Sequence, residues 1–141
     1  VKLELDLRFE AASASELREN LKNDIGIRVP KVFWPLTSKK ILTLEWVDGI
    51  SINNTEKLKQ TGHNLNDLAT KLALTFLNQA FRDGFFHADI HQGNLFVNQN
   101  SEIVIVDFGI MGRINNNDRR FVAEIFYGFL ERDYEHVTKV H

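Results

Sequence analysis

Three polar residues near the middle of the chain have the chemistry of a divalent-cation site. Asp89 and Asn94 lie five positions apart (94 − 89), and Asp107 follows thirteen positions after Asn94 (107 − 94). Carboxylate and amide oxygens are hard ligands of the kind that Mg²⁺ prefers. We therefore expect Asn94 and Asp107 to bind Mg²⁺. Asp89 would then orient a hydroxyl group or accept its proton.

The stretch between Asn94 and Asp107 predicts how the three side chains could meet. Leu95–Val97 and Ile103–Val106 are short apolar runs, and Asn98–Ser101 between them consists of turn-forming residues. This pattern predicts two strands joined by a tight turn. Because a hairpin brings its two ends together, we expect the residues before and after it to converge on one small volume.

The arrangement matches the protein-kinase signature H-x-D-x-x-x-x-N followed by D-F-G. The triplet Asp107, Phe108 and Gly109 is common by chance, but the two motifs joined by a hairpin of this length form a specific pattern. We expect His87 to be structural, packing beneath the Asp-Phe-Gly turn, and Phe108 to lie in the core. His91 would either contact a phosphate group or stabilise the loop with a hydrogen bond.

A second interpretation of the same loop is a transition-metal cluster. His87, Asp89 and His91 alternate along the chain, which would place three ligands on one face of a strand. That interpretation leaves Asn94 and Asp107 unexplained, so the magnesium site is favoured.

Composition restricts the class of protein further. The chain has 141 residues, of which 43% are hydrophobic, enough to bury one modest core. Its net charge is −2 with mixed signs, which offers no basic stripe for nucleic acid and no polybasic cluster for a membrane surface. The absence of cysteine excludes disulfides and thiolate zinc sites. No apolar run approaches the length of a membrane span, so we expect a soluble chain.

Periodicity predicts that helices surround the hairpin and that a pair of strands precedes it. The expected helices are Leu3–Asn23, Thr55–Gln60, Asn66–Arg82 with its end at Gly84, one from Asn117 or Asp118 to Leu130, and one opening at Asp133. The expected strands are Arg28–Trp34 and Lys40–Trp46. No repeat or long linker interrupts this order, which predicts a single unit.

Four stretches carry a closer match to a known family. They are ELDLRFEAASA (Glu4–Ala14), EWVDG (Glu45–Gly49), FRDGFFHADIHQGN (Phe81–Asn94) and VDFGIMGR (Val106–Arg113). With these motifs in this order, the chain resembles the UbiB family of atypical protein-kinase-like proteins over essentially its whole length. The resemblance implies an α+β, protein-kinase-like fold with a mostly helical large lobe.

The resemblance also implies roles for residues outside the hairpin. Glu4 and Asp6 fall on the family's E-x-D motif. Glu10 falls where a helix glutamate pairs with the nucleotide-binding lysine of an upstream strand. Since that lysine is not in this chain, we expect Glu10 to be a solvated helix charge here. The hinge, whose backbone would hydrogen-bond adenine, is matched by Glu45, Trp46 and Val47.

The sequence departs from the family pattern in two respects. Gln92 stands where the family usually has proline, which loosens the catalytic loop without removing a ligand. The family's alanine-rich phosphate loop, nucleotide lysine and K-x-G-Q motif would all lie upstream of Val1. We therefore expect a fragment forming a single partial domain, inactive alone. Residues 1–46 would end a small lobe, with a two-stranded remnant, and residues 47–141 would form the large lobe.

The function implied by the resemblance is that of an atypical kinase or ATPase that binds Mg²⁺ and ATP and supports ubiquinone biosynthesis. It would act at the cytoplasmic face of the bacterial inner membrane or its mitochondrial counterpart, with a lipid, a quinone-pathway molecule or other biosynthesis proteins as partners. Two alternatives stay open. One is a small-molecule phosphotransferase of the aminoglycoside- or choline-kinase type, and the other is a nucleotide-sensing scaffold without productive transfer.

Overall fold

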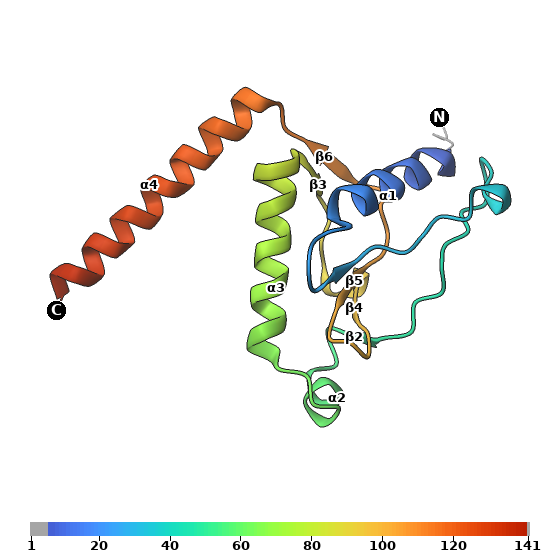
Figure 1. Cartoon of the computed structure of the whole chain (residues 1–141), viewed down its shortest axis with the longest axis horizontal. Helices are drawn as coiled ribbons and strands as arrows, with labels where there is room; N and C mark the ends of the chain where they lie inside the picture. The colour runs from blue at the N-terminus through green and yellow to red at the C-terminus, as the bar shows by residue number, and fades with distance from the viewer. Residues whose placement is uncertain (1–5, 141) are drawn as a thin grey trace, which may run out of the picture.

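A computed structural model describes residues 6–140, with side chains described except at positions 126, 129, 130 and 133–140. The helices are α1 (Leu7–Leu21), α2 (Thr55–Gln60), α3 (Leu65–Leu77) and α4 (Asn116–Val140). The strands are β1 (Ile27–Arg28), β2 (Ile50–Ser51), β3 (Phe85–His87), β4 (Leu95–Val97), β5 (Ile103–Ile105) and β6 (Met111–Arg113). Short 3₁₀ turns at Trp34–Leu36 and Gln92–Asn94 and a π-helical turn at Asn78–Asp83 complete the order (Figure 1).

The predicted hairpin is present and lies at the centre of the larger sheet. β4 and β5 pair antiparallel with Leu95 opposite Ile105, and the strand order of this sheet is β1-β5-β4-β2. β1 runs parallel to β5, whereas β2 is antiparallel to β4. A second, two-stranded sheet pairs β3 with β6 in antiparallel register. β3, which leads into the loop at residues 88–94, is therefore hydrogen-bonded to β6, which follows the Asp-Phe-Gly turn.

The core lies between the central sheet, α1 and α3. All three residues of β5 are buried, as are the first and last residues of β4. The same cluster of buried side chains includes Leu17 of α1, Leu68 of α3 and Phe108. Burying these apolar surfaces together is the main source of stability in a chain of this size. The ends of the hairpin therefore rest directly on the core.

Helix α1 begins at a polar cap and buries one face. The Asp6 side chain accepts a hydrogen bond from the Arg8 backbone N–H, which satisfies one of the free donors at the helix start. The buried residues recur every three or four positions, which keeps them on one side of a helix: Ala11, Ala14, Leu17 and Leu21. The predicted helix Leu3–Asn23 is therefore present with a shorter observed range, and Glu4 lies outside the described residues.

The two strands expected before the hairpin are much shorter than predicted. The segment expected as strand Arg28–Trp34 contains only the end of β1. It is joined to the segment expected as strand Lys40–Trp46 by one isolated bridge, Val32 opposite Leu44. Pro30 and Pro35 lack the N–H that a ladder needs, and Trp34–Leu36 forms a 3₁₀ turn instead. The two segments still run antiparallel, with hydrogen bonds from Phe33 N–H to Thr43 O and from Glu45 N–H to Lys31 O.

Helix α3 changes its winding before it ends. The predicted helix was continuous to Arg82, but the α-helical part stops at Leu77 and residues Asn78–Asp83 form a wider π-helical turn. Gly84 ends it as predicted, in the left-handed conformation at φ +66°. A side chain at this position would place a Cβ 2.6 Å from the carbonyl oxygen of Ile114. Glycine is therefore required both by the backbone conformation and by the close approach.

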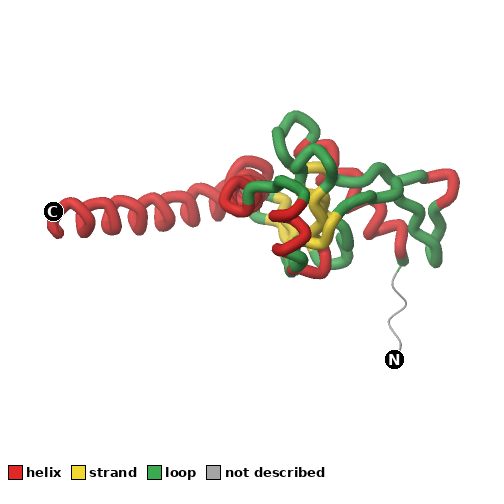
Figure 2. Tube along the Cα trace, turned by 90° about the horizontal axis from the view of Figure 1, so that it is seen from below, coloured by secondary structure: helices red, strands yellow, loops and turns green. Residues whose placement is uncertain are grey.

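Helix α4 extends away from the rest of the chain (Figures 1 and 2). It runs unbroken from Asn116 to Val140, so the expectation of a separate helix opening at Asp133 is wrong. The helix contains no proline, the residue that would interrupt it. The cap is Asn115, whose Oδ1 accepts the Asp118 N–H at 2.8 Å, rather than Asn117 or Asp118. None of the described helices is long and apolar enough to cross a membrane.

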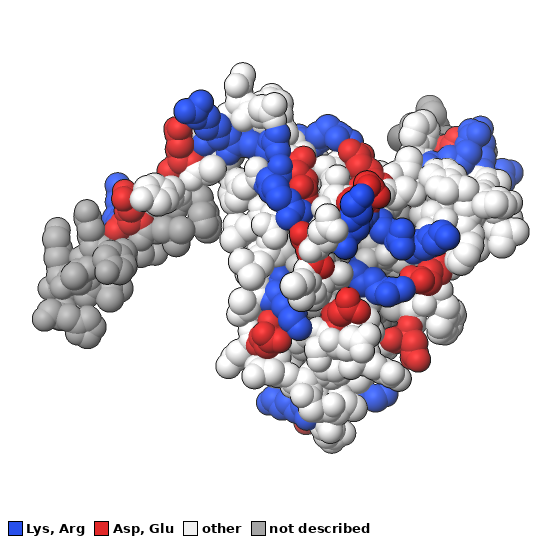
Figure 3. Space-filling view, in the orientation of Figure 1, with Lys and Arg blue, Asp and Glu red and all other residues white. Residues whose placement is uncertain are grey.

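The described surface carries charges of both signs. On the face shown in Figure 3, Lys and Arg side chains alternate with Asp and Glu side chains, in keeping with the small net charge. The mixture of helices with a few short strands establishes the α+β class that the sequence predicts.

Candidate active site

The side chain of His87 links the two motifs of the signature. His87 is 2% exposed, and its Nδ1 accepts the backbone N–H of Asp89 at 3.1 Å. Because Nδ1 acts as the acceptor, the proton is on Nε2, which donates to the backbone carbonyl of Asp107. One buried imidazole therefore fixes both the catalytic loop and the Asp-Phe-Gly turn.

Asn94 is the second connection between the loop and the hairpin. It is buried, its Nδ2 donates to the Asp89 carbonyl at 3.2 Å, and its own carbonyl accepts the Val106 N–H at 2.9 Å. We call Asp89, Asn94 and Asp107, joined in this way around the imidazole, the His87 unit. The convergence expected from the hairpin is thus present in the backbone. With Nδ2 used as a donor, Oδ1 is the atom of the amide that could face a cation.

Asp107 is held in a strained backbone conformation. Its φ of +66° is in the left-handed region, which is uncommon for a residue with a side chain. Its Oδ1 accepts the Gly109 N–H at 3.3 Å, and the neighbouring Phe108 is buried with its ring 6.2 Å from that of His87. Strain of this kind persists where the surroundings fix the residue, and such positions cluster at functional sites.

The carboxylates of the His87 unit are exposed and have no counter-charge within the described part of the chain. Neither Asp89 nor Asp107 forms an ion pair there, and no group of three or more His, Asp or Glu side chains is arranged around a metal position. Both ring nitrogens of His87 are occupied by the protein, which argues against the transition-metal interpretation. Carboxylate and amide oxygens, the side-chain groups of Asp89, Asp107 and Asn94, are of the type that a hard divalent cation takes.

His91 is exposed at the mouth of the same loop. Its Nδ1 accepts the Gly93 N–H at 3.1 Å. This contact is the loop-stabilising hydrogen bond that was one of the two expectations. It leaves the second nitrogen free of described partners and in reach of solvent.

Glu10 does not behave as the solvated helix charge expected of it. Its Oε1 accepts the backbone N–H of Phe108 at 3.1 Å, and the side chain is half-buried. The expectation failed because it considered only the missing lysine, whereas a carboxylate also accepts hydrogen bonds from backbone donors. Helix α1 is thereby attached to the residue that follows Asp107.

Two further contacts involve α1. Arg113 donates to both carboxylate oxygens of Glu16, at 3.0 and 2.8 Å, and these hydrogen bonds lower the pKa of Glu16. The Arg113 guanidinium also lies 4.5 Å from the ring centroid of Phe85. At the helix start, hydrogen bonds from Arg8 lower the pKa of Asp6 to about 2. The structure therefore places Asp6 at the cap of α1.

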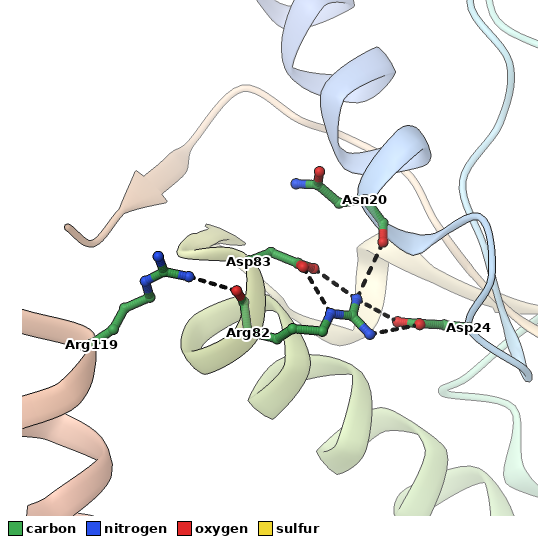
Figure 4. Close-up of polar contacts among 5 residues, drawn as sticks. All are labelled: Asn20, Asp24, Arg82, Asp83 and Arg119. Atoms are coloured by element: carbon green, nitrogen blue, oxygen red, sulfur yellow. Dashed lines mark hydrogen bonds and ion pairs between the residues drawn. The ribbon is translucent and has the colours of Figure 1, made fainter. Parts of the chain in front are cut away.

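A network around Arg82 joins the π-helical turn to α1 and α4 (Figure 4). Its guanidinium donates to Asp24, to Asp83 and to the Asn20 carbonyl, and the two carboxylates raise its pKa. Arg119 of α4 donates to the Arg82 carbonyl. These three elements are distant in sequence, and the network fixes how the π-helical turn sits between them.

Gln79 is a residue of this region that sequence reasoning missed. It lies on the π-helical turn, and its side chain bonds to the backbone of His87. The available signal was its position on the apolar stripe of the helix, where a polar side chain should have a specific partner.

The residues expected to form the hinge border a separate cavity of about 200 Å³. Its lining consists of Arg28, Glu45, Trp46, Val47, Asp48, Asn98 and Val104. Arg28 Nη2 donates to both carboxylate oxygens of Glu45 at 3.0 Å, and Trp46 is 88% exposed. Val104 belongs to β5, so the hairpin contributes to this cavity as well as to the His87 unit. Arg28 and Val104 carry no motif and were not predicted.

The fold and the paired motifs define a protein-kinase-like domain, and comparison with known proteins gives its family. A family model described as the ABC1 atypical kinase-like domain matches residues 1–141, and the chain belongs to this family. Proteins named "Probable protein kinase UbiB" are 39% identical in Histophilus somni and Pasteurella multocida and 40% identical in Glaesserella parasuis. The UbiB resemblance is thus confirmed.

These relatives are considerably longer than the chain. Each match covers 98% of this chain but only 26 to 27% of the relative. Among solved structures, the Rv3197–erythromycin complex from Mycobacterium tuberculosis is similar over 78% of this chain and 27% of that chain, with 27% identity and a TM-score of 0.65. The fold of this chain is therefore shared with that solved structure, of which the chain also spans only a part.

Proposed function

We propose that the whole protein binds Mg²⁺ and ATP and acts as an atypical kinase or ATPase of the UbiB type that supports ubiquinone biosynthesis. The observation that carries this proposal is the His87 unit, in which one imidazole and one buried amide fix the positions of Asp89, Asn94 and Asp107. Phosphoryl transfer depends on positioning and charge neutralisation more than on covalent chemistry with the protein.

Each residue of the unit has a proposed role. Asn94 Oδ1 and the Asp107 carboxylate would hold Mg²⁺, which would supply charge neutralisation for the phosphate oxygens of ATP. The exposed Asp89 carboxylate positions the attacking hydroxyl group or water and accepts its proton. His91, which is exposed on the same loop, would contact a phosphate group. Glu10 holds the Phe108 backbone and thereby the orientation of Asp107.

Adenine would bind beside the hinge. Glu45, Trp46 and Val47 line the cavity that Val104 also lines, and the apolar β5 residue suits one face of a purine ring. The ion pair with Arg28 holds the Glu45 side chain in place, which helps to fix the backbone that would meet the base.

The segment after the Asp-Phe-Gly turn favours a small or lipid-like substrate, or water, over a protein substrate. Met111–Arg113 is paired with β3, and α4 begins at Asn116, so only six residues (116 − 109 − 1) lie between Gly109 and the helix. No Ala-Pro-Glu sequence follows, and Ile110–Asn117 contains no serine, threonine or tyrosine. A peptide-docking platform of the protein-kinase kind has no room to form there.

Calorimetry with the whole protein tests the metal assignment. Asp107→Asn should weaken Mg²⁺-dependent ATP binding by more than about 100-fold, because removing a direct ligand exceeds the effect of losing an outer-shell partner. Asp67→Asn, which alters an α3 surface carboxylate paired with Lys71, is the matched control and should bind as wild type. Equal Mg-ATP affinity in wild type and Asp107→Asn would refute the assignment.

Turnover separates the kinase or ATPase from the nucleotide-sensing scaffold. Asp89→Asn should retain Mg-ATP binding but lose turnover by about 10²- to 10⁴-fold. If wild type binds Mg-ATP but shows no turnover with or without membrane lipids, the scaffold is the better description. The family assignment makes the aminoglycoside- or choline-kinase alternative the less favoured one.

Transfer of radiolabelled γ-phosphate to a peptide library and to a membrane extract tests the substrate class. We expect ATP hydrolysis or labelled small molecules, without labelled peptides. Strong peptide labelling that disappears in Asp89→Asn would show that proteins are the substrates. Action at the cytoplasmic face of a membrane remains part of the proposal, and binding to lipid vesicles would test it.

A further inference from the structure

Gln79 is a fully buried polar residue on the π-helical turn beneath the catalytic loop. Its side chain is 0% exposed, and its Oε1 accepts the backbone N–H of His87 at 2.9 Å in a buried hydrogen bond. The other half of the amide, Nε2, has no hydrogen-bond partner within the described part of the chain. The residue is therefore an acceptor for one specific backbone group.

A half-satisfied amide is a costly choice for a helix interior. Burying a donor without a partner costs free energy, and an apolar side chain of similar length would avoid that cost. Packing alone therefore gives no reason for glutamine at this position. The contact to His87 is the property that an apolar residue could not supply.

The π-helical turn sets the direction of Gln79. The turn Asn78–Asp83 is wider than an α-helical turn, and such turns are frequent at functional sites. Gln79 is buried on its inner side, while the exposed Arg82 fixes its outer side to Asp24 and to the Asn20 carbonyl (Figure 4). The Gly84 N–H donates to the Gln79 carbonyl and closes the turn. Both ends of the glutamine are thus held.

His87 transmits this constraint to the candidate active site. Its backbone N–H is bonded to Gln79, and its ring is bonded to the Asp89 N–H and to the Asp107 carbonyl. A shift of the His87 backbone would therefore move the residue proposed to position the nucleophile and the residue proposed to bind Mg²⁺. Even a small displacement of these two residues matters, because catalysis depends on the alignment of reacting groups.

We propose that Gln79 is a positioning residue, whose side-chain oxygen sets the His87 backbone and through it the placement of Asp89 and Asp107. The proposal rests on the proposed function for its effect on turnover. The hydrogen bond itself and its influence on the loop can be tested without any activity.

The test compares three variants of the whole protein. Gln79→Met removes the acceptor at nearly constant length, and Gln79→Glu keeps an acceptor oxygen in the same place. Thr75→Val, one turn earlier on the same helix, replaces another buried polar residue by an apolar one of similar shape and serves as the control. Each variant is measured for kcat, for the Mg²⁺ concentration that gives half-maximal rate, and for backbone amide exchange at His87 and Asp89.

We expect Gln79→Met to lower kcat by about 10- to 100-fold and to raise the half-maximal Mg²⁺ concentration. Loss of an outer-shell partner commonly has an effect of this size. Gln79→Glu should recover most of the lost rate, and Thr75→Val should match wild type. Exchange at the His87 and Asp89 amides should accelerate in Gln79→Met alone. The same rate and Mg²⁺ dependence in Gln79→Met and wild type, or equal losses in Gln79→Met and Thr75→Val, would overturn the proposal.

Amide exchange distinguishes failure of this inference from failure of the proposed function. If wild type shows no turnover, the proposed catalytic function fails, and exchange at Asp89 in Gln79→Met then decides whether Gln79 positions the loop. Unchanged protection of the Asp89 amide in Gln79→Met would overturn the proposal that Gln79 positions the loop. If Gln79→Met does not fold, wild type still provides a test, since fast exchange of the His87 amide would contradict the hydrogen bond.

Discussion

The catalytic segment (residues 84–113) and the hinge segment (residues 33–48) are held in place by different means. The catalytic segment is anchored by two pairs of strands and by partly buried hydrogen bonds, in which His87 Nδ1 accepts the Asp89 N–H and Asn94 Nδ2 donates to the Asp89 carbonyl. The hinge segment has one isolated bridge, and two threonine hydroxyls hold its loop, with Thr37 donating to the Phe33 carbonyl and Thr43 to the Leu36 carbonyl.

The two segments also differ in how exposed their large apolar side chains are. Phe85 and Phe108 of the catalytic segment are buried. Large apolar side chains of the hinge segment are exposed: Phe33, Trp34, Leu36, Ile41 and Trp46. The candidate active site therefore belongs to a segment with buried aromatic side chains. The segment expected to bind the base has more exposed apolar side chains and should contribute less to the stability of the domain.

The largest difference between the segments should appear when an aromatic side chain is removed from each. Phe108→Ala empties a buried position and should lower the free energy of unfolding by about 3 to 5 kcal/mol. Trp46→Ala removes an exposed side chain and should change it by less than about 0.5 kcal/mol. Urea unfolding followed by circular dichroism measures both, and losses of similar size would contradict the contrast.

A glycine of the catalytic segment gives the next largest effect. Gly84→Ala adds a methyl group 2.6 Å from the Ile114 carbonyl in a left-handed backbone, which should cost about 2 to 4 kcal/mol of unfolding free energy. The reference is Gly62→Ala, which has a similar backbone at φ +88° but nothing within 4 Å, and should cost about 1 to 2 kcal/mol. Thermal unfolding of the pair isolates the contribution of the close contact.

The hinge segment should depend on its threonine hydroxyls. Thr43→Val removes the hydrogen bond to the Leu36 carbonyl and should cost about 1 kcal/mol, with faster amide exchange confined to residues 33–45. Thr70→Val on α3 is the control, because its hydroxyl bonds only to a carbonyl of its own helix and the change should stay within about 0.5 kcal/mol. An effect spread through the catalytic segment would show that the two segments are coupled.

The smallest expected effect concerns the ion pair at the end of the catalytic segment. Hydrogen bonds from Arg113 lower the pKa of Glu16 below its ordinary value of 4.5, so the folded state favours the carboxylate. The stabilisation is present above that value and is lost as the pH falls through the lowered folded pKa. Glu16→Gln should therefore cost at most about 1 kcal/mol at pH 7, and the difference from wild type should shrink in acid. A difference that grows below pH 4 would contradict this assignment.

Local spacing predicted the central hairpin, the Gly84 terminus and the presence of helix α1. These features depend on turn-forming residues and on a 3.6-residue period, both of which are visible in the sequence. The family resemblance added the hinge and helix glutamate. The roles of Asp89, Asn94, Asp107 and His91 remain predictions.

Features that depend on distant partners could not be read from local pattern. The π-helical turn looks like ordinary helix in its residue types, since its winding follows from tertiary contacts such as those of Arg82. The pairing of β1 with β5, and the use of Glu10 as an acceptor for the Phe108 N–H, join segments that are far apart in sequence. Pro30 and Pro35 lack the N–H that a strand ladder needs, and this limits the pairing of the segment Arg28–Trp34.

The attachment of α1 to the last strands has a consequence for the order of folding during synthesis. Glu10 meets Phe108 across 98 positions and Glu16 meets Arg113 across 97, and β1 pairs with β5 rather than with a neighbour in sequence. At about 5 to 20 residues per second, a ribosome makes those partners roughly 5 to 20 seconds after α1. Throughout that interval α1 lacks its hydrogen bonds to Phe108 and Arg113. We expect nascent chains stalled before residue 103 to remain sensitive to protease within α1, and chains extended past residue 113 to become resistant.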